Sequence, residues 1–226
     1  MNRLTTIPKE NEIKYGILLL LFQQLLLPIL LAFLCGMIMT DAEINLCYFA
    51  INLLMTVLIF RSYIWQSVKS STWNTGRFIS SVATGYVVYY IASTIIGFLI
   101  LVFYPDFLNL NDDSILSMAE QQLPLIVIGT VLLVPPVEEI LFRGMIFGSL
   151  YNRRPVLAYI LSSVLFSIIH LLGYLSIYTP VELLLAFIQY LPAGFVLAWT
   201  FVRADTIFAP ILLHVLVNSV AILSMR

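Results

Sequence analysis

Apolar residues dominate seven long stretches of this chain, and short polar segments separate them. A helix needs roughly 20 apolar residues to cross the hydrocarbon core of a bilayer. The pattern therefore predicts an all-α, polytopic integral membrane protein with about seven transmembrane helices. The predicted spans lie near residues 15–40, 46–61, 79–104, 124–150, 156–178, 182–202 and 207–225.

The composition agrees with a membrane location. Of 226 residues, 61% are hydrophobic and 10% are charged, and the mean hydropathy is +1.01. A water-soluble fold of this size cannot bury so much apolar surface, so the lipid bilayer is the expected solvent. The net charge is only -1 and the basic residues are scattered, which argues against nucleic-acid binding. Cys35 and Cys47 are expected to be reduced, packed thiols.

Lysine and arginine residues indicate the orientation, because they gather in cytoplasmic loops. They flank alternate predicted spans, whereas the intervening loops hold acidic residues such as Asp41, Asp106 and Glu182 and no basic ones. We therefore expect a multi-pass protein of the cell membrane with a cytoplasmic N-terminus. The basic residues that set this orientation are Arg3, Lys9, Lys14, Arg61, Lys69, Arg77, Arg153, Arg154 and Arg203.

Two regions follow one another along the chain. Residues 1–104 form an N-terminal transmembrane region, whose first apolar run is too long for a cleavable signal peptide and is expected to remain. Within it, residues 62–78 mix tryptophans such as Trp73 with basic residues, as expected of an interfacial segment on the membrane surface. An external loop over 105–123, with room for a short helix, leads into the second region, residues 120–222.

Five ionisable residues lie inside the predicted spans and away from their ends. They are Glu138, Glu139, Arg143, His170 and His214, and the two histidines are the only ones in the chain. An ionisable group near the bilayer centre costs several kcal/mol unless it is paired or hydrated, so each of the five is a candidate functional residue.

Three spans bring polar groups to a similar depth. With about 1.5 Å of rise per residue from the nearest basic residue, Glu138 lies about 22 Å along its span, His170 about 24 Å and Asn218 about 22 Å. His214 precedes Asn218 by one turn, at about 16 Å. All of these depths are measured from the same membrane face, so we expect the side chains to converge.

The two glutamates of the fourth span are expected to lie on different faces of the helix. Glu139 and Arg143 are four residues apart and are expected to pair along one helix face, while Glu138 points about 100° away and stays free. Pro135 and Pro136 directly precede the pair, interrupt helical hydrogen bonding and free backbone carbonyls, so a kink or wet pocket is expected there.

Other features of the spans have simpler interpretations. A small-xxx-small pair, Gly144 and Gly148, allows another helix to approach closely. Gln23, Gln24 and Gln189 show no convergence with the charged residues and are interpreted as helix-packing groups.

The polar residues inside the spans also have a purely structural interpretation. A single intramembrane histidine or asparagine often serves as a hydrogen-bonding strut between helices, and a phenylalanine such as Phe166 usually packs. The Glu pair with Arg143 is open to interpretation as a structural ion pair. The convergence of Phe166 and His170 on one face, and of His214 and Asn218 on another, favours a functional site.

These motifs together resemble the CAAX-protease and bacteriocin-processing family of intramembrane proteases, also called CPBP or Abi. The resemblance covers roughly residues 120–222, and residues 1–104 add nothing to it. It implies an intramembrane endopeptidase on an all-helical fold, acting on a membrane-associated protein or peptide precursor. The motifs are, in order, Glu138-Glu139-x-x-x-Arg143, Phe166-x-x-x-His170 and His214-x-x-x-Asn218.

The resemblance implies that Glu138 is the catalytic carboxylate and that His170, His214 and Asn218 complete the site. In the expected mechanism, Glu138 takes a proton from water with help from His170, while His214 and Asn218 stabilise the oxyanion. The supporting residues are Glu139, Arg143 and Phe166.

Two questions stay open at this point. Glu138, His170 and His214 match a known zinc ligand set, so the cofactor is either none or zinc; the absence of an HExxH motif and the poor affinity of asparagine for zinc favour a metal-free site. The same fold also suits a non-catalytic bacteriocin-immunity or regulatory protein, or, as a more distant alternative, a proton-coupled transporter.

Overall fold

The computed structural model describes residues 3–70 and 74–224, and within these ranges every regular element is helical. The all-α prediction is confirmed. In chain order the elements are α1 (Glu10–Leu21), η1 (Phe22–Leu26), α2 (Leu27–Cys35), α3 (Asp41–Ile59), α4 (Arg61–Lys69), α5 (Thr75–Phe103), α6 (Leu110–Ile126), η2 (Val127–Leu133), α7 (Val134–Glu139), η3 (Ile140–Phe147), α8 (Gly148–Tyr151), α9 (Pro155–Ile169), η4 (Leu172–Tyr174), α10 (Pro180–Ala204) and α11 (Phe208–Ser224).

Five helical segments are long and apolar enough to cross a bilayer, so the chain is a multi-pass membrane protein. These segments are Glu10–Cys35, Asp41–Ile59, Thr75–Phe103, Leu110–Tyr151 and Pro180–Ala204. Two further apolar helices, Pro155–Ile169 and Phe208–Ser224, are shorter than a full crossing. All seven predicted apolar spans thus correspond to helices, although five rather than seven have the length of a membrane span.

The predicted span 156–178 is wrong in its extent. Helix α9 ends at Ile169, a 3₁₀ turn over Leu172–Tyr174 follows, and α10 begins at Pro180. Gly173 lowers the helical propensity of this stretch, and Thr179 with Pro180 supplies a helix start. The consequence is that His170 stands at the end of a helix instead of inside one.

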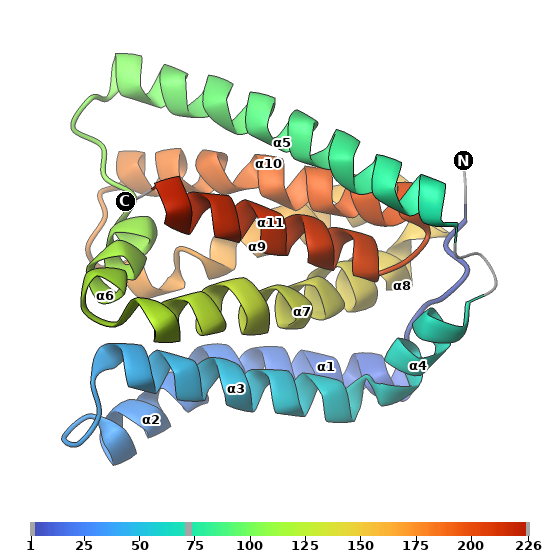
Figure 1. Ribbon diagram of the computed structural model, residues 1–226, viewed down its shortest axis with the longest axis horizontal. Coiled ribbons are helices and arrows are strands. Elements are labelled where there is room, and N and C mark those ends of the chain that lie inside the picture. Colours follow the sequence, from blue (N-terminus) through green and yellow to red (C-terminus); the bar gives the residue numbers. More distant parts are fainter. Residues whose placement is uncertain (1–2, 71–73, 225–226) are drawn as a thin grey trace.

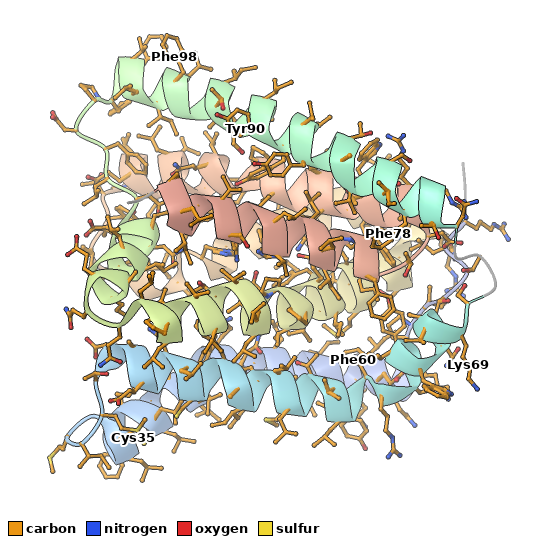
Figure 2. All side chains as sticks on the ribbon, viewed as in Figure 1. Cys35, Phe60, Lys69, Phe78, Tyr90 and Phe98 are labelled. Carbon is orange, nitrogen blue, oxygen red and sulfur yellow. The ribbon has the colours of Figure 1, made fainter. Side chains whose placement is uncertain are left out.

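The long helices lie side by side with similar axes (Figure 1). Helices α1 and α3 form one edge of the bundle and α5 the opposite edge, with α7, α9, α10 and α11 between them. Helix α1 starts at the end of the bundle that holds α4, and α11 finishes at the other end. Figure 2 places Lys69 at the first end and Cys35 at the opposite one.

Acidic residues in two predicted external loops cap helices. Glu43 and Thr40 form a reciprocal capping box at the start of α3, and Glu182 and Thr179 form another at the start of α10. At the other end of α10, Asp205 adopts a left-handed conformation with φ 54° and stops the helix. These polar residues define where the apolar helices begin and end.

The hydrophobic core is continuous between the N-terminal and C-terminal regions. Buried residues of α1 and α4, such as Leu19 and Tyr63, belong to the same apolar cluster as Phe142 and Phe201. Helix α5 differs, because most of its residues are exposed; Figure 2 shows Phe98 on its outer side. Such an exposed apolar surface is expected for a helix that faces lipid.

The Gly144 and Gly148 pair allows close approach of N-terminal segments. A Cβ atom at Gly144 would lie 2.9 Å from the Tyr63 ring of α4, and one at Gly148 would lie 3.9 Å from Ile7. The predicted close packing is present at Gly144, where the partner is α4, whereas Gly148 has only an ordinary contact with the segment before α1.

The predicted interfacial segment is described in part. Helix α4 buries Tyr63 and Ser67 while Trp65 is 60% exposed, with the Lys69 ammonium 4.5 Å from the centre of its indole. Trp73 lies outside the described residues. The predicted loop over 105–123 contains a helix as expected, since α6 begins at Leu110 and continues into the fourth apolar segment.

Helices α9 and α10 touch at Gly194. A Cβ atom there would lie 2.8 Å from the backbone Cα of Ser163, whereas a Cβ atom at Gly97 of α5 would meet nothing within 4 Å. We predict that Gly194→Ala lowers the free energy of unfolding by about 1–3 kcal/mol, because the backbones must move apart. Thermal unfolding in detergent should show a lower Tm for Gly194→Ala and no loss for Gly97→Ala; equal Tm values would contradict the close approach.

Candidate active site

The helix that carries the Glu pair is irregular on both sides of it. Segments η2 and η3, which flank α7, have π-helical hydrogen bonding. The Val134 N–H bonds to the Gly129 carbonyl five residues back, and Pro135 has no N–H to offer to Thr130. The freed Thr130 carbonyl accepts a 2.8 Å hydrogen bond from Nδ2 of Asn218 on α11. The expected interruption of helical bonding is therefore present, and Asn218 occupies it.

Glu139 is the centre of a buried ion network. Its Oε1 atom accepts from Nη1 of Arg143 at 3.0 Å and lies 2.8 Å from Nδ1 of His214. The second guanidinium nitrogen donates to the carbonyls of Ala193 and Gly194 on α10, at 3.2 Å each. The predicted Glu139–Arg143 pair is confirmed, and it links η3 to α10 and α11.

Glu138 lacks such a partner. Its Oε2 atom is buried without a hydrogen bond and lies 3.9 Å from Nε2 of His214. The Glu138 side chain is 16% exposed and that of Glu139 is 0% exposed, so only the first glutamate is reachable. The two residues differ because successive helical side chains point about 100° apart.

A cavity of about 430 Å³ unites the predicted catalytic residues. Glu138, His170, His214 and Asn218 all line it, from α7, the end of α9 and α11. These elements lie together in the middle of the bundle (Figure 1). The convergence that helix rise predicted for separate spans is thus found in the fold.

The ring of His170 is fixed by the end of α9 and by two aromatic neighbours. Its Nδ1 atom is 2.8 Å from the Phe166 carbonyl, which only accepts, so Nδ1 carries a proton. The ring lies 4.7 Å from that of Phe166 and stacks on Tyr190 at 4.4 Å and 25°. With Nδ1 engaged, Nε2 is the ring nitrogen left for chemistry.

Phe166 touches more than one part of the site. The Arg143 guanidinium carbon lies 4.2 Å from the centre of the Phe166 ring, which suits a cation–π contact. The centre of the Phe166 ring also lies 6.0 Å from that of His214, with the two ring planes at 68°. It lies 4.7 Å from the centre of the His170 ring. Phe166 thus packs, as its chemistry suggests, and in doing so contacts both histidines and the buried cation.

Known proteins resemble the part of the chain that carries Glu138, His170, His214 and Asn218. Residues 120–220 match the sequence profile of the family described as type II CAAX prenyl endopeptidase Rce1-like. The family resemblance predicted from the motifs is confirmed. Residues 120–220 are called the Rce1-like segment below, after the profile that they match.

Two curated relatives also align with the chain. "Putative membrane peptidase YdiL" of Bacillus subtilis (strain 168) is 33% identical over 115 residues, covering 50% of this chain and 42% of the relative. "UPF0177 protein YxdF" of Lactococcus lactis subsp. lactis (strain IL1403) is 30% identical over 112 residues, covering 49% and 56%. The chain therefore spans about half the length of the curated relatives it matches. No solved structure matches it.

The zinc ligand set considered from the sequence is not assembled in the Rce1-like segment. Among residues 3–70 and 74–224, no group of three His, Cys, Asp or Glu side chains converges in a way that would hold a metal ion. Nδ1 of His170 and Nδ1 of His214 both bond to protein oxygens, which leaves both Nε2 atoms, and Glu138 approaches only the second histidine, at 3.9 Å. The three side chains are therefore not gathered into a zinc ligand set in the part of the chain that the structure describes.

Several residues of the site were missed or misread in the sequence. Thr130 and Tyr190 were not among the acidic, basic or histidine residues that the sequence singled out inside the spans, and Asp112 belonged to a predicted loop. Gln24 and Gln189, interpreted as packing groups, line the same cavity as Glu138, so that interpretation was incomplete. The prolines after Thr130 were the one available signal, since they free its carbonyl.

The Glu139–Arg143 pair should dominate the stability of the Rce1-like segment. Arg143→Met leaves the Glu139 carboxylate buried with only His214 beside it, and we predict a loss of about 3–5 kcal/mol. The double variant Glu139→Gln, Arg143→Met should recover part of that loss, because neither charge remains. The free energy of unfolding in detergent is measured for the single and the double variant. A double variant less stable than Arg143→Met would contradict the pairing.

Proposed function

We propose that the protein is an intramembrane endopeptidase of the CAAX type, with Glu138, His170, His214 and Asn218 as its catalytic residues. One observation carries the proposal: a reachable carboxylate whose Oε2 atom has no hydrogen bond shares a cavity with both histidines of the chain, while the neighbouring glutamate is bound to arginine. The Rce1-like match of residues 120–220 supports the same activity.

Glu138 acts as the general base. Its carboxylate takes a proton from a water molecule in the cavity as the water oxygen attacks the carbonyl carbon of the scissile peptide bond. Nε2 of His170 has a lone pair when Nδ1 donates to the Phe166 carbonyl, so it accepts the second water hydrogen and orients the attack.

His214 and Asn218 stabilise the tetrahedral oxyanion. In this step His214 carries protons on both ring nitrogens, with Nδ1 donating to Glu139 and Nε2 directed at the developing charge. One Nδ2 hydrogen of Asn218 is bound to the Thr130 carbonyl, which leaves the other for the oxyanion. Fixed donors of this kind need no reorganisation when the charge develops.

The intermediate then collapses. The carbon–nitrogen bond breaks, the carbonyl re-forms, and Glu138 returns its proton to the leaving amine nitrogen. Glu139 and Arg143 take no proton in this sequence; they hold His214 and the helix that carries Glu138. Phe166 keeps both imidazole rings in place through its contacts with them.

The substrate class follows from the location of the site. A cavity among membrane helices suits a membrane-associated protein or peptide precursor that enters from the bilayer or from the cytoplasmic face. We place the protein in the cell membrane with its N-terminus in the cytoplasm, because the basic residues gather at one end of the bundle.

The activity is tested by reconstituting the protein in liposomes with quenched fluorescent peptides, both prenylated and unmodified. Glu138→Gln and His170→Ala should each reduce kcat by at least about 100-fold, since base and water-orienting group are lost. Glu138→Gln should keep a Tm close to that of the wild type, because the Glu138 Oε2 atom has no hydrogen bond and its contact with His214 is long, at 3.9 Å.

Glu120→Gln is the matched control, as Glu120 is exposed on α6 away from the cavity lining. It should retain full activity. Cleavage that survives both Glu138→Gln and His170→Ala would overturn the peptidase assignment and favour a non-catalytic role.

A further inference from the structure

A second, smaller pocket reaches Glu138 from the side of α1 and α3. It has a volume of about 40 Å³, against about 430 Å³ for the main cavity, and Glu138 lines both. Gln23 of η1 and Asn52 of α3 line this side pocket and not the main cavity. The N-terminal region, outside the Rce1-like segment, therefore contributes polar groups next to the proposed base. The polar residues that line the side pocket are Gln23, Gln24, Tyr48, Asn52 and Glu138.

The backbone of η1 is interrupted in the same way as that of η2. The Leu27 N–H bonds to the Phe22 carbonyl five residues back, and Pro28 has no N–H to offer to Gln23. The freed Gln23 carbonyl accepts a 3.0 Å hydrogen bond from the Tyr48 hydroxyl of α3. Irregular backbone within a membrane span is tolerated where it lines a polar space, and this interruption agrees with a polar pocket between η1 and α3.

Three buried oxygen atoms of residues in the side pocket have no hydrogen-bond partner among the described residues. They are Oε1 of Gln23, Oδ1 of Asn52 and Oε2 of Glu138. Gln23 is 4% exposed and Asn52 is 3% exposed, so neither amide reaches the surface of the protein. A buried acceptor without a donor destabilises a fold. Because all three atoms are acceptors, they cannot satisfy one another, and a bound molecule has to supply the donors.

Water fits the side pocket better than a peptide or a metal ion does. An ordered water needs about 10–15 Å³ and two to four polar partners, so the side pocket has room for at least one water and none for a peptide. One water donates two hydrogen bonds, so two waters satisfy the three acceptors. A cation such as Ca²⁺ takes about six to eight oxygen ligands. The side pocket offers three unpartnered ones among apolar residues such as Leu133 and Val137.

We infer that the side pocket is a water site, in which Gln23 and Asn52 hold water against the Glu138 carboxylate. The inference rests on the proposed function, in which Glu138 takes a proton from water. A peptide that fills the main cavity displaces water there, whereas the side pocket opens on the same carboxylate and excludes the peptide by its size. Water from the side pocket replaces the molecule that each turnover consumes. Gln23 and Asn52 are thus positioning residues that the N-terminal region contributes.

The test compares two nearly isosteric apolar substitutions in the reconstituted full chain, Asn52→Leu and Gln23→Met. Each removes one amide that holds water and leaves the residues of the main cavity unchanged. We expect kcat for peptide cleavage to fall at least about tenfold, with KM within about twofold of the wild-type value, because neither residue meets the substrate. Tm should stay at or above that of the wild type, since an apolar group replaces one whose oxygen has no protein donor.

Thr56→Val is the matched control. Thr56 lies one turn after Asn52 on α3, is 0% exposed, and its hydroxyl has no partner among the described residues, but it does not line the side pocket. This variant should keep the wild-type kcat. Asn52→Ser should recover most of the activity that Asn52→Leu loses, because its hydroxyl and the space beside it admit a water.

Experimental structures in lipid, at a resolution that shows waters, give a readout without turnover. The wild type should show water between the amides of Gln23 and Asn52 and the Glu138 carboxylate, and Asn52→Leu should show none beside residue 52. A direct hydrogen bond between the two amides, or a metal ion in place of water, would overturn the inference.

The kinetic outcomes separate this inference from the proposed function. A wild-type kcat in both Asn52→Leu and Gln23→Met would overturn the inference and leave the peptidase function standing. Tm values that fall in step with kcat in both variants would also overturn it, because the amides would then be helix-packing groups. Failure of the wild type to cleave any peptide would instead count against the proposed function, and the two structures would decide the water site alone.

Discussion

A charged guanidinium in the interior of a membrane protein requires partners for its charge, and at Arg143 both terminal nitrogens, Nη1 and Nη2, have them. The cation is fully buried, and its partners come from three places: Glu139 one turn earlier, the α10 carbonyls of Ala193 and Gly194, and the Phe166 ring. Since Glu139 also bonds to His214, the same network connects η3, α9, α10 and α11. Removing one charge would leave the other exposed to a low dielectric constant, which makes the network costly to break.

This network gives two adjacent glutamates different roles. Glu139 neutralises Arg143 and orients His214, so its role is structural. Glu138, turned about 100° around the helix, keeps a carboxylate that no protein donor occupies. The prolines before Glu138 also help to build the site. They leave the Thr130 carbonyl free of helical hydrogen bonding, and this carbonyl then holds Asn218 at the cavity wall. Irregular backbone inside a membrane is tolerated where it lines a polar cavity, and this segment meets that condition.

The sequence predicted the local parts of this arrangement well. The Glu139–Arg143 pair depends only on a spacing of four residues, and the common depth of Glu138, His170 and Asn218 depends only on helix rise. Both are found. The end of α9 at Ile169 was missed, because hydropathy continues through the 3₁₀ turn that follows.

The missed contributions are non-local. Tyr190 stacks on His170 because α10 packs against α9, and Asp112 reaches the cavity where the start of α6 meets Tyr190 of α10. Sequence spacing carries no information about that docking, and Asp112 on its own resembles an ordinary loop residue. The spacing of the possible zinc ligands is also non-local. Two histidines and a glutamate were enough to suggest a ligand set, but how close their side chains come depends on the packing of α7, α9 and α11, and among the described residues no such set converges.

The central claim is that Glu138, and not Glu139, faces the reacting peptide bond. The most direct measurement is an experimental structure of the Glu138→Gln variant with an uncleaved peptide bound in a lipid environment. We predict a peptide in the cavity with its scissile carbonyl beside residue 138, the ring of His170 and the amide of Asn218, while Arg143 remains paired with Glu139. A peptide bound beside Glu139, or outside the cavity altogether, would contradict the account.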